Sequence, residues 1–368
     1  MVTGSKTKVL KSGGANYLYT ISYYDEKGRI IQTQGTNIFG TGVVDKATTQ
    51  YSWNGTPLRI LEEHAKAGTN PQTHTVLTKM NYDFAGRLQN TTNTITSDIS
   101  NSATSLATEI NNPEKTIDTY TYDEMSRVKT KTLGTKANTN YLTGPAFETL
   151  NYDYNVRGWL TGINKAYTQY ASTANYFGME LGYDKSVPSN TTTSFVPVYD
   201  GNISGMVWKS KVDGVPRKYD YIYDNVSQLT KANFLQSIGG ITWDKTAVDY
   251  SLNTILYDVN GNIKKLNQNG FVLGGASNID DLTYNYGTAT NANSNKLMNV
   301  LDAAPNNGQS KLGVYHYAVA KTSTSVDYGY DPNGNLTSDI NKNITSITYN
   351  VLNLPWVITT PKGTIIYT

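Results

Sequence analysis

Tyrosine and aliphatic residues recur along the chain on either side of a short polar stretch. Tyr24, for example, is followed by the polar run 25–29 and then by Ile30. Ahead of a similar stretch, Tyr120 and Tyr122 are two positions apart, and a period of two places both side chains on one face of a strand. The same spacing joins Tyr152 to Tyr154, Tyr221 to Tyr223 and Tyr328 to Tyr330. The pattern therefore predicts a strand, a tight turn and a returning strand, which together form a β-hairpin.

The polar stretch has a constant form. It begins with Tyr and Asp or Asn, continues through two variable residues to Gly, Ser or Asn, and ends with a polar and an aliphatic residue. Complete copies begin at Tyr24, Tyr82, Tyr122, Tyr154, Tyr223, Tyr257 and Tyr330; a degenerate copy begins at Tyr349, and weaker relatives begin at Tyr183 and Tyr199. Recurrence of one short motif along a chain is typical of repeat architectures.

Each motif position has a physical role in a turn. The Asp or Asn side chain accepts hydrogen bonds from backbone amides just ahead of it. Gly three positions later tolerates the left-handed conformation that closes a hairpin through a bulge. Pro332 stands where the fixed φ of proline suits the turn. We therefore assign to structural turns Tyr24, Asp25, Gly28, Tyr82, Asp83, Gly86, Tyr122, Asp123, Tyr154, Asn155, Gly158, Tyr223, Asp224, Tyr257, Asp258, Gly261, Tyr330, Asp331 and Gly334.

The hairpins are expected to form one continuous array over residues 1–368, because no linker divides the chain. A lone hairpin cannot bury an aromatic stripe, whereas stacked hairpins cover one another. Polar insertions separate the copies: residues 92–119, within which Asp98–Asn111 forms either a short helix or a loop, and the loops Asn291–Asn295 and Ala303–Gly313. The predicted fold class is therefore all-β, with tandem antiparallel β-hairpins.

Composition narrows the function classes. Thirty-one basic and 29 acidic residues leave a net charge of +2, without the concentrated basic face that binds nucleic acid. The 29 tyrosines suit an extended sheet with partly polar faces, since each hydroxyl needs a partner. The chain contains no cysteine, which is compatible with export. No apolar run has the length of a membrane span, and the opening MVTGSKTKVL lacks the apolar core of a signal peptide.

Candidate chemical groups favour structural roles. His64, His74 and His316 are scattered, with no zinc motif among them. Segments 258–262 and 331–335 resemble fragments of calcium loops but lack the distal acidic ligand. Asp280 and Asp281 would point to opposite faces of a strand, although a pair of carboxylates from distant segments stays open. We expect no catalytic, cofactor-binding or metal-binding residue.

Aromatic and arginine side chains are expected to hold the array together. Arg29, Arg87 and Arg127 recur at one place beside the turn, which indicates hydrogen bonds between adjacent hairpins. The five tryptophans favour packing within the wall over sugar-stacking platforms; they are Trp53, Trp159, Trp208, Trp243 and Trp356.

These motifs resemble the YD or RHS repeat family, whose motif has the form Tyr-Asp-x-x-Gly-Arg-Leu. The copies at Tyr24, Tyr82 and Tyr122 come closest, and segments 152–164 and 201–209 are similar to the version in exported proteins of Bacteroidetes-type bacteria. The resemblance covers nearly the whole chain. It implies a β-sheet ribbon that spirals into a hollow shell, which in bacteria commonly encapsulates a C-terminal toxin or effector.

The sequence departs from the family's closing core, which carries an Asp-Pro-x-Gly motif. Asp331-Pro332-Asn333-Gly334 fits that motif superficially, yet its flanking residues make it a repeat turn. The end at 365–368 has the pattern of a strand opening another hairpin. We therefore expect a fragment of a larger protein, from which the closing core and the cargo are missing.

The leading functional hypothesis is a non-catalytic shell segment of a large exported bacterial protein, secreted or held at the cell surface. It would sequester a C-terminal effector for delivery in interbacterial competition. The resemblance implies as partners the protein's own effector, a secretion machinery, and an immunity protein or a surface glycan. The alternatives are a cell-surface adhesin that binds glycans through Tyr and Trp, and an enzyme with paired carboxylates in an open groove.

Overall fold

A computed structural model describes the parts of the chain from which the fold is built. They are residues 3–9, 16–37, 42–68, 71–99, 110–135, 146–169, 172–184, 195–239, 242–272, 275–287, 294–304, 315 and 320–367. Strands dominate these residues, and every strand pairing is antiparallel. The predicted fold class, all-β with tandem antiparallel hairpins, is confirmed. No described helix is long and apolar enough to cross a membrane.

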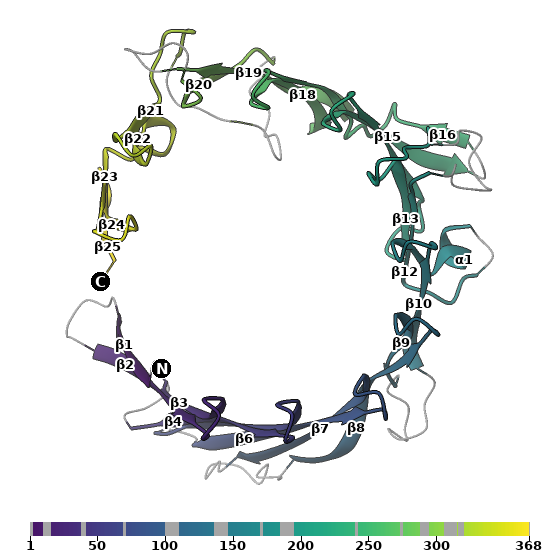
Figure 1. The fold of residues 1–368 in the computed structure, drawn as a ribbon, viewed down its shortest axis with the longest axis vertical. Coiled ribbons are helices and arrows are strands. Elements are labelled where there is room, and N and C mark those ends of the chain that lie inside the picture. The colour runs from purple at the N-terminus through teal and green to yellow at the C-terminus, as the bar shows by residue number, and fades with distance from the viewer. Residues whose placement is uncertain are drawn as a thin grey trace. The chain divides into compact units, whose positions relative to one another are not determined.

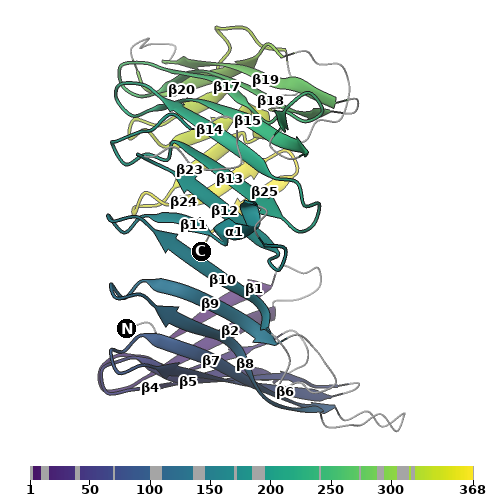
Figure 2. The same ribbon diagram turned by 90° about the vertical axis from the view of Figure 1, so that its right-hand side faces the viewer.

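The chain divides into two compact units, of which the first is Met1–Asp153. Successive strands of this unit pair with one another, from β1 with β2 to β9 with β10, which is a meander. Strands β5 to β8, for example, pair in that order, and Figure 2 shows them in the lower part of the view. The strands are β1 (Gly4–Val9), β2 (Asn16–Tyr24), β3 (Ile30–Thr36), β4 (Val44–Tyr51), β5 (Pro57–Lys66), β6 (Gln72–Tyr82), β7 (Leu88–Ile99), β8 (Ile110–Tyr122), β9 (Val128–Thr135) and β10 (Ala146–Tyr154).

The second unit, Tyr154–Thr368, continues the same plan (Figure 1). Its larger sheet contains β11 (Leu160–Ile163), β12 (Phe177–Gly182), β13 (Gly205–Ser210), β14 (Arg217–Tyr223), β15 (Leu229–Gly239), β16 (Thr242–Asp244), β17 (Leu252–Tyr257), β18 (Ile263–Val272), β19 (Gly275–Tyr286) and β20 (Leu297–Asp302). Two small sheets follow: β21 (Tyr328–Tyr330) with β22 (Leu336–Asp339), and β23 (Ser346–Tyr349) with β24 (Pro355–Thr360) and β25 (Gly363–Ile366). The short helices are α1 (Lys165–Thr168) and the 3₁₀ turn η1 (Ile340–Lys342).

Among the described residues, buried apolar side chains are few, and in the second unit aromatic rings surround one of them, Phe234. Phe234 is 1% exposed, and its ring lies 5.4 Å from the rings of both Tyr219 and Tyr250. Trp208 stacks on Tyr219 at 5.6 Å. Buried polar side chains are as prominent and include Lys218. A sheet covered by little other structure therefore depends on aromatic contacts along its face and on polar pairing.

The predicted insertion at 92–119 is wrong in its boundaries. Asp98 lies in β7 and Asn111 lies in β8, so both ends of the segment expected to be a helix or a loop belong to strands. The Thr-rich run from Thr91 to Thr96 pairs with β8, because β-branched side chains suit a pleated strand. Residues 100–109 lie outside the described part. Of the loops expected at 291–295 and 303–313, only 294–295 and 303–304 are described, and neither pair lies in a strand.

Candidate functional site: the linked hairpin turns and a buried lysine cluster

Each motif residue occupies a repeated turn, for which Asp25 is the example. The amide of Asp25 donates to Arg29 O at 2.9 Å, and the amide of Gly28 donates to Asp25 O at 3.0 Å. The carboxylate Oδ1 of Asp25 accepts the amides of Lys27 and Arg29, both at 2.9 Å. The side-chain bond to the amide four residues on recurs at Asp83, Asp123, Asn155, Asp224, Asp258, Asp331 and Asn350.

The residue three positions after each Asp or Asn adopts the left-handed conformation. Gly28 has φ 78° and Gly86 has φ 79°, whereas Ser126 and Asn353 take φ 62° and 60° without being glycine. Strand pairing shifts register at the tyrosine, as between Tyr23 and Tyr24, which is the bulge that closes such a hairpin.

One hairpin of the same geometry was not predicted, because its sequence does not match the motif. Ser52 replaces the Asp: its Oγ accepts the amide of Thr56 at 3.0 Å, and the amide of Gly55 donates to Ser52 O at 3.1 Å. Pro57 replaces the aliphatic residue at the start of β5. The spacing of Tyr51, Gly55 and position 57 was the available signal. A longer relative follows Tyr286, where the amide of Gly287 donates to Lys296 O at 2.8 Å.

Motif tyrosines tie each hairpin to the one before it. The Tyr257 hydroxyl donates to Leu229 O at 2.9 Å, and Leu229 is the residue that begins the return strand of the preceding hairpin. The same bond joins Tyr51 to Ile30, Tyr82 to Pro57, Tyr122 to Leu88, Tyr183 to Leu160, Tyr223 to Ile203, Tyr286 to Ile263, Tyr330 to Leu297 and Tyr349 to Leu336. Burial raises the pKa of Tyr257, so its hydroxyl keeps the proton it donates.

The residue beside the turn forms a second link, which confirms the expected role of the arginines at two places. Arg29 Nε donates to its own Asp25 at 2.6 Å, while Nη1 reaches Ser52 O of the next hairpin at 3.1 Å. Arg87 likewise donates to Ser126 Oγ at 3.0 Å. In the second unit, Asn262 takes this position and donates to Asp258 and Asn295, each at 2.9 Å.

Tyr257→Phe is expected to lower the free energy of unfolding by about 1 kcal/mol, because a half-buried carbonyl loses its donor while the ring remains. Urea denaturation followed by circular dichroism measures the change. Tyr199→Phe serves as the matched control, since Tyr199 is 74% exposed. Equal effects of the two substitutions would contradict the linking role of the hydroxyl.

Stability is expected to fall in acid through the turn carboxylates. The amide of Arg87 and then its side chain hold the pKa of Asp83 below its ordinary 3.8. A lowered folded-state pKa gives stability that is present above the unfolded value and is lost as pH falls through the folded one. Asp83→Asn keeps the turn bonds, as Asn155 does naturally, and should flatten the loss of stability below pH 3.8 in denaturation curves. An unchanged pH profile would refute this assignment.

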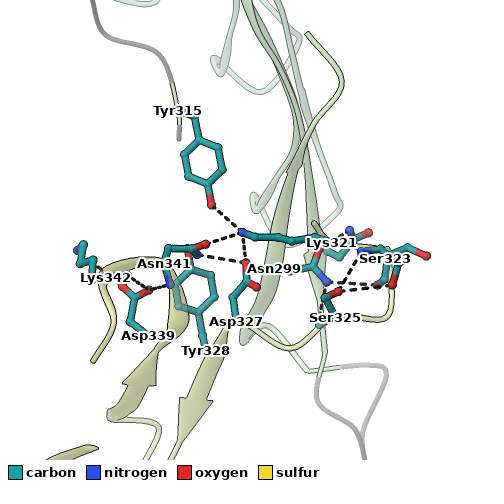
Figure 3. Close-up of polar contacts among 12 residues, drawn as sticks. Asn299, Tyr315, Lys321, Ser323, Ser325, Asp327, Tyr328, Asp339, Asn341 and Lys342 are labelled. Atoms are coloured by element: carbon teal, nitrogen blue, oxygen red, sulfur yellow. Dashed lines mark hydrogen bonds and ion pairs between the residues drawn. The ribbon is translucent and has the colours of Figure 1, made fainter. Parts of the chain in front are cut away.

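A lysine-centred cluster lies beside the Tyr330 hairpin (Figure 3). Lys321 and Asp327 form an ion pair at 2.6 Å, and both side chains are 3% exposed. The Lys321 amine also donates to Asn341 Oδ1 at 2.6 Å and reaches the Tyr315 hydroxyl at 3.5 Å. The Asn341 amide nitrogen donates to Asp327 Oδ2 at 3.2 Å and to the Tyr328 hydroxyl at 3.3 Å. Burial, followed by the bond to Tyr328, raises the pKa of Tyr315.

Neighbouring groups fix this cluster in place. Asp339 caps η1, because its Oδ1 accepts the amide of Asn341 at 3.0 Å and that of Lys342 at 3.3 Å. Asn299, fully buried on β20, donates to the carbonyls of Ser323 and Ser325 in the segment that carries Lys321. Polar contacts thus hold together the segment that carries Lys321, strand β20 and η1.

Two hollows border the cluster. One has a volume of about 250 Å³ and is lined by Lys321, Asp327 and Asn341 among others. The other is an open groove of about 620 Å³ whose lining includes Tyr315, Tyr328 and Tyr330. The cluster contains two buried aspartates, but Asp327 pairs with Lys321 and Asp339 caps η1. Asp327 therefore faces an amine, and Asp339 serves the backbone of η1.

Two of the three histidines lie on neighbouring strands. His64 and His74 stand opposite each other on β5 and β6, a proximity that their spacing in sequence did not reveal. His74 contacts Ser97 and His64 lies 3.8 Å from Asp45, and no group of three metal-ligating side chains occurs in the described residues. His316 lies outside them.

Turn aspartates and tryptophans follow the expectations in part. The oxygens of Asp258 and Asp331 serve turn amides and Asn side chains. Asp280 is buried and accepts from Gln268, while Asp281 pairs with Lys265 on the other face. The expectation of wall packing is wrong for Trp53, which is 87% exposed, because it lies in the turn itself. Trp208 packs as expected.

Comparisons with known proteins found no matching family model and no matching curated protein. Two solved structures are similar over 99% of this chain. One, a mutant Tc holotoxin pore of Photorhabdus luminescens, has 12% identity and a TM-score of 0.23; the other, TcdB2-TccC3 without its hypervariable C-terminal region, has 13% identity and a TM-score of 0.25. The chain spans 18% and 20% of their lengths. TM-scores this low do not establish a shared fold.

Proposed function

We propose that the chain is a non-catalytic wall segment built from YD-type hairpins. The observation that carries this proposal is the repeated tyrosine bond, in which one hairpin's hydroxyl donates to the carbonyl that begins the preceding return strand, as Tyr82 does to Pro57. The recurrent Asp and Gly residues form the turns, and most of the recurrent tyrosines form the links. Their repetition therefore serves the building of a sheet, and the commonest acids of the chain are committed to it.

The wall would belong to a large exported protein, secreted or at the surface of a bacterium, and would enclose a C-terminal effector. Support comes from the polar character of the strands: β7 (Leu88–Ile99) reads LQNTTNTITSDI and offers little continuous apolar surface. A surface of this kind can face a partly unfolded cargo with little tendency to aggregate with it. The effector and a secretion machinery are the proposed partners.

The test is to express the complete gene that encodes this chain and to examine the product by limited proteolysis and electron microscopy. A protease-resistant shell with internal density is the expected result. A compact particle without a lumen, or the absence of coding sequence after Thr368, would reject enclosure. Tyr82→Phe combined with Tyr122→Phe should make the wall more sensitive to protease, whereas Tyr199→Phe should not.

A second candidate function is glycan adhesion, favoured by the exposure of Trp53. Its ring is accessible at the tip of a turn, and the Lys27 amine lies 3.6 Å from the ring centroid. Exposed aromatic rings can stack on sugar faces. Binding on a glycan array that Trp53→Ala abolishes and Phe84→Ala preserves would support adhesion, since Phe84 is also an exposed aromatic residue in a hairpin turn.

A further inference from the structure

A single carboxylate oxygen in the Lys321 cluster contacts both an amine and an amide nitrogen. Asp327 Oδ2 lies 2.6 Å from the Lys321 amine and 3.2 Å from Nδ2 of Asn341. The same amine lies 2.6 Å from Oδ1 of Asn341, so the Asn341 Cγ carbon is one bond behind the atom that the amine already touches. The Lys321 amine as nucleophile, the Asn341 Cγ carbon that it would attack and the Asp327 carboxylate that would carry the proton therefore lie together (Figure 3).

We propose that Lys321 and Asn341 join through an intramolecular isopeptide bond, formed by the folded chain itself with Asp327 as general base and acid. The bond would be an amide between Lys321 Nζ and Asn341 Cγ, with ammonia as the leaving group. It would close the segment that carries Lys321 onto η1 and so clasp the β21–β22 hairpin between its two ends.

The proton and atom balance closes without another reactant. The Lys321 ammonium gives one proton to Asp327, and the neutral amine attacks Cγ to form the new C–N bond. Asp327 passes that proton to Nδ2, the Cγ–Nδ2 bond breaks, and ammonia departs. The second proton lost by the attacking nitrogen passes through Asp327 to ammonia, which leaves as ammonium. Asp327 ends in its starting form, and nothing is oxidised or reduced.

Burial supports this course. The side chains of Lys321 and Asp327 are both 3% exposed, so little water reaches the reacting groups. Asp339 holds the backbone of η1, and the Tyr328 hydroxyl accepts from Nδ2, so the Asn341 side chain is held toward the amine. The hollow of about 250 Å³ beside Lys321 gives the released ammonia a way out.

The intact mass of the purified, folded 368-residue chain tests the proposal. The expected mass is lower than that of the sequence by one ammonia, and tandem mass spectrometry of a digest should show one branched peptide joining Lys321 to Asn341. Asp327→Asn and Lys321→Arg should each restore the full mass. Asn341→Asp should still cross-link, now with loss of water, because the leaving group has changed. Lys342→Arg, next to the site and with a largely exposed side chain, should leave the cross-link intact.

A cyclic imide at Asn341 would also lose ammonia, and Lys321→Arg separates the two reactions. The imide would persist in that variant, whereas the cross-link would vanish together with the mass loss. Circular dichroism shows whether each variant is folded, and the wild-type result decides even if a variant unfolds. A folded wild-type chain with the full sequence mass, or a mass loss without the branched peptide, overturns the proposal.

Discussion

Phe234→Ala is expected to lower the free energy of unfolding of the second unit by about 3–5 kcal/mol. Phe234 is 1% exposed, and its ring contacts those of Trp208, Tyr219 and Tyr250. Aromatic pairs of this kind contribute beyond the area that they bury. In the described part of the chain, few other buried apolar side chains surround Phe234. The neighbouring residues therefore have little means of moving into the cavity that the substitution leaves.

Equilibrium denaturation with near-ultraviolet circular dichroism measures this loss, since the same rings give the signal. Phe84→Ala is the matched control: Phe84 is fully exposed at a turn, and its loss should change stability by less than about 0.5 kcal/mol. Similar losses for the two variants would show that Phe234 is not the centre of packing. A separate transition of the first unit should be unaffected by Phe234→Ala.

Asp220→Ala is expected to cost about 3–5 kcal/mol, because it removes the carboxylate that neutralises a buried ammonium. The Lys218 side chain is 0% exposed, and its amine lies 3.2 Å from Asp220 Oδ2 and 5.7 Å from the rings of Phe195 and Trp243. Desolvation raises the pKa of Asp220, with Lys218 opposing it. The ammonium therefore lies where charge is costly, whereas the Asp220 side chain is 26% exposed.

The double variant Lys218→Met, Asp220→Leu separates charge from packing. It should be about neutral or slightly stabilising, because a buried ion pair replaced by apolar groups of similar size loses no net stability. The more exposed pair Asp213–Arg217 supplies the control: Asp213→Ala should cost less than about 1 kcal/mol. If Asp213→Ala and Asp220→Ala had equal effects in urea denaturation, burial would not govern the contribution of the Lys218 pair.

The hairpins could be predicted from the sequence because their determinants are local. Asp83 and Gly86 lie three positions apart, and the bonds that they make stay within the same turn. The turn at Ser52 was missed because a hydroxyl replaces the carboxylate there. The strands within 92–119 were missed because their polar side chains resemble those of a loop, although Thr also favours strands.

The Lys321 cluster could not be predicted, because its members lie in separate segments without a shared spacing. Lys321 and Asn341 are brought together by β21, β22 and η1, and Asn299 joins from an earlier strand. The recurrent acids lie within motifs, whereas Asp327 directly precedes the tyrosine pair Tyr328 and Tyr330 and belongs to no motif. A buried cluster of this kind is set by the tertiary path of the chain.

The linkage between successive hairpins also bears on the order in which the chain folds. Almost every strand pairs with the next strand in sequence, and the linking tyrosines reach back to carbonyls that were synthesised earlier, as Tyr349 does to Leu336. Such neighbour-only pairing gives a low contact order, which favours rapid folding. A chain emerging from its amino terminus can therefore add one hairpin at a time to a finished edge, and a force applied at its carboxyl terminus should remove the hairpins in the reverse order.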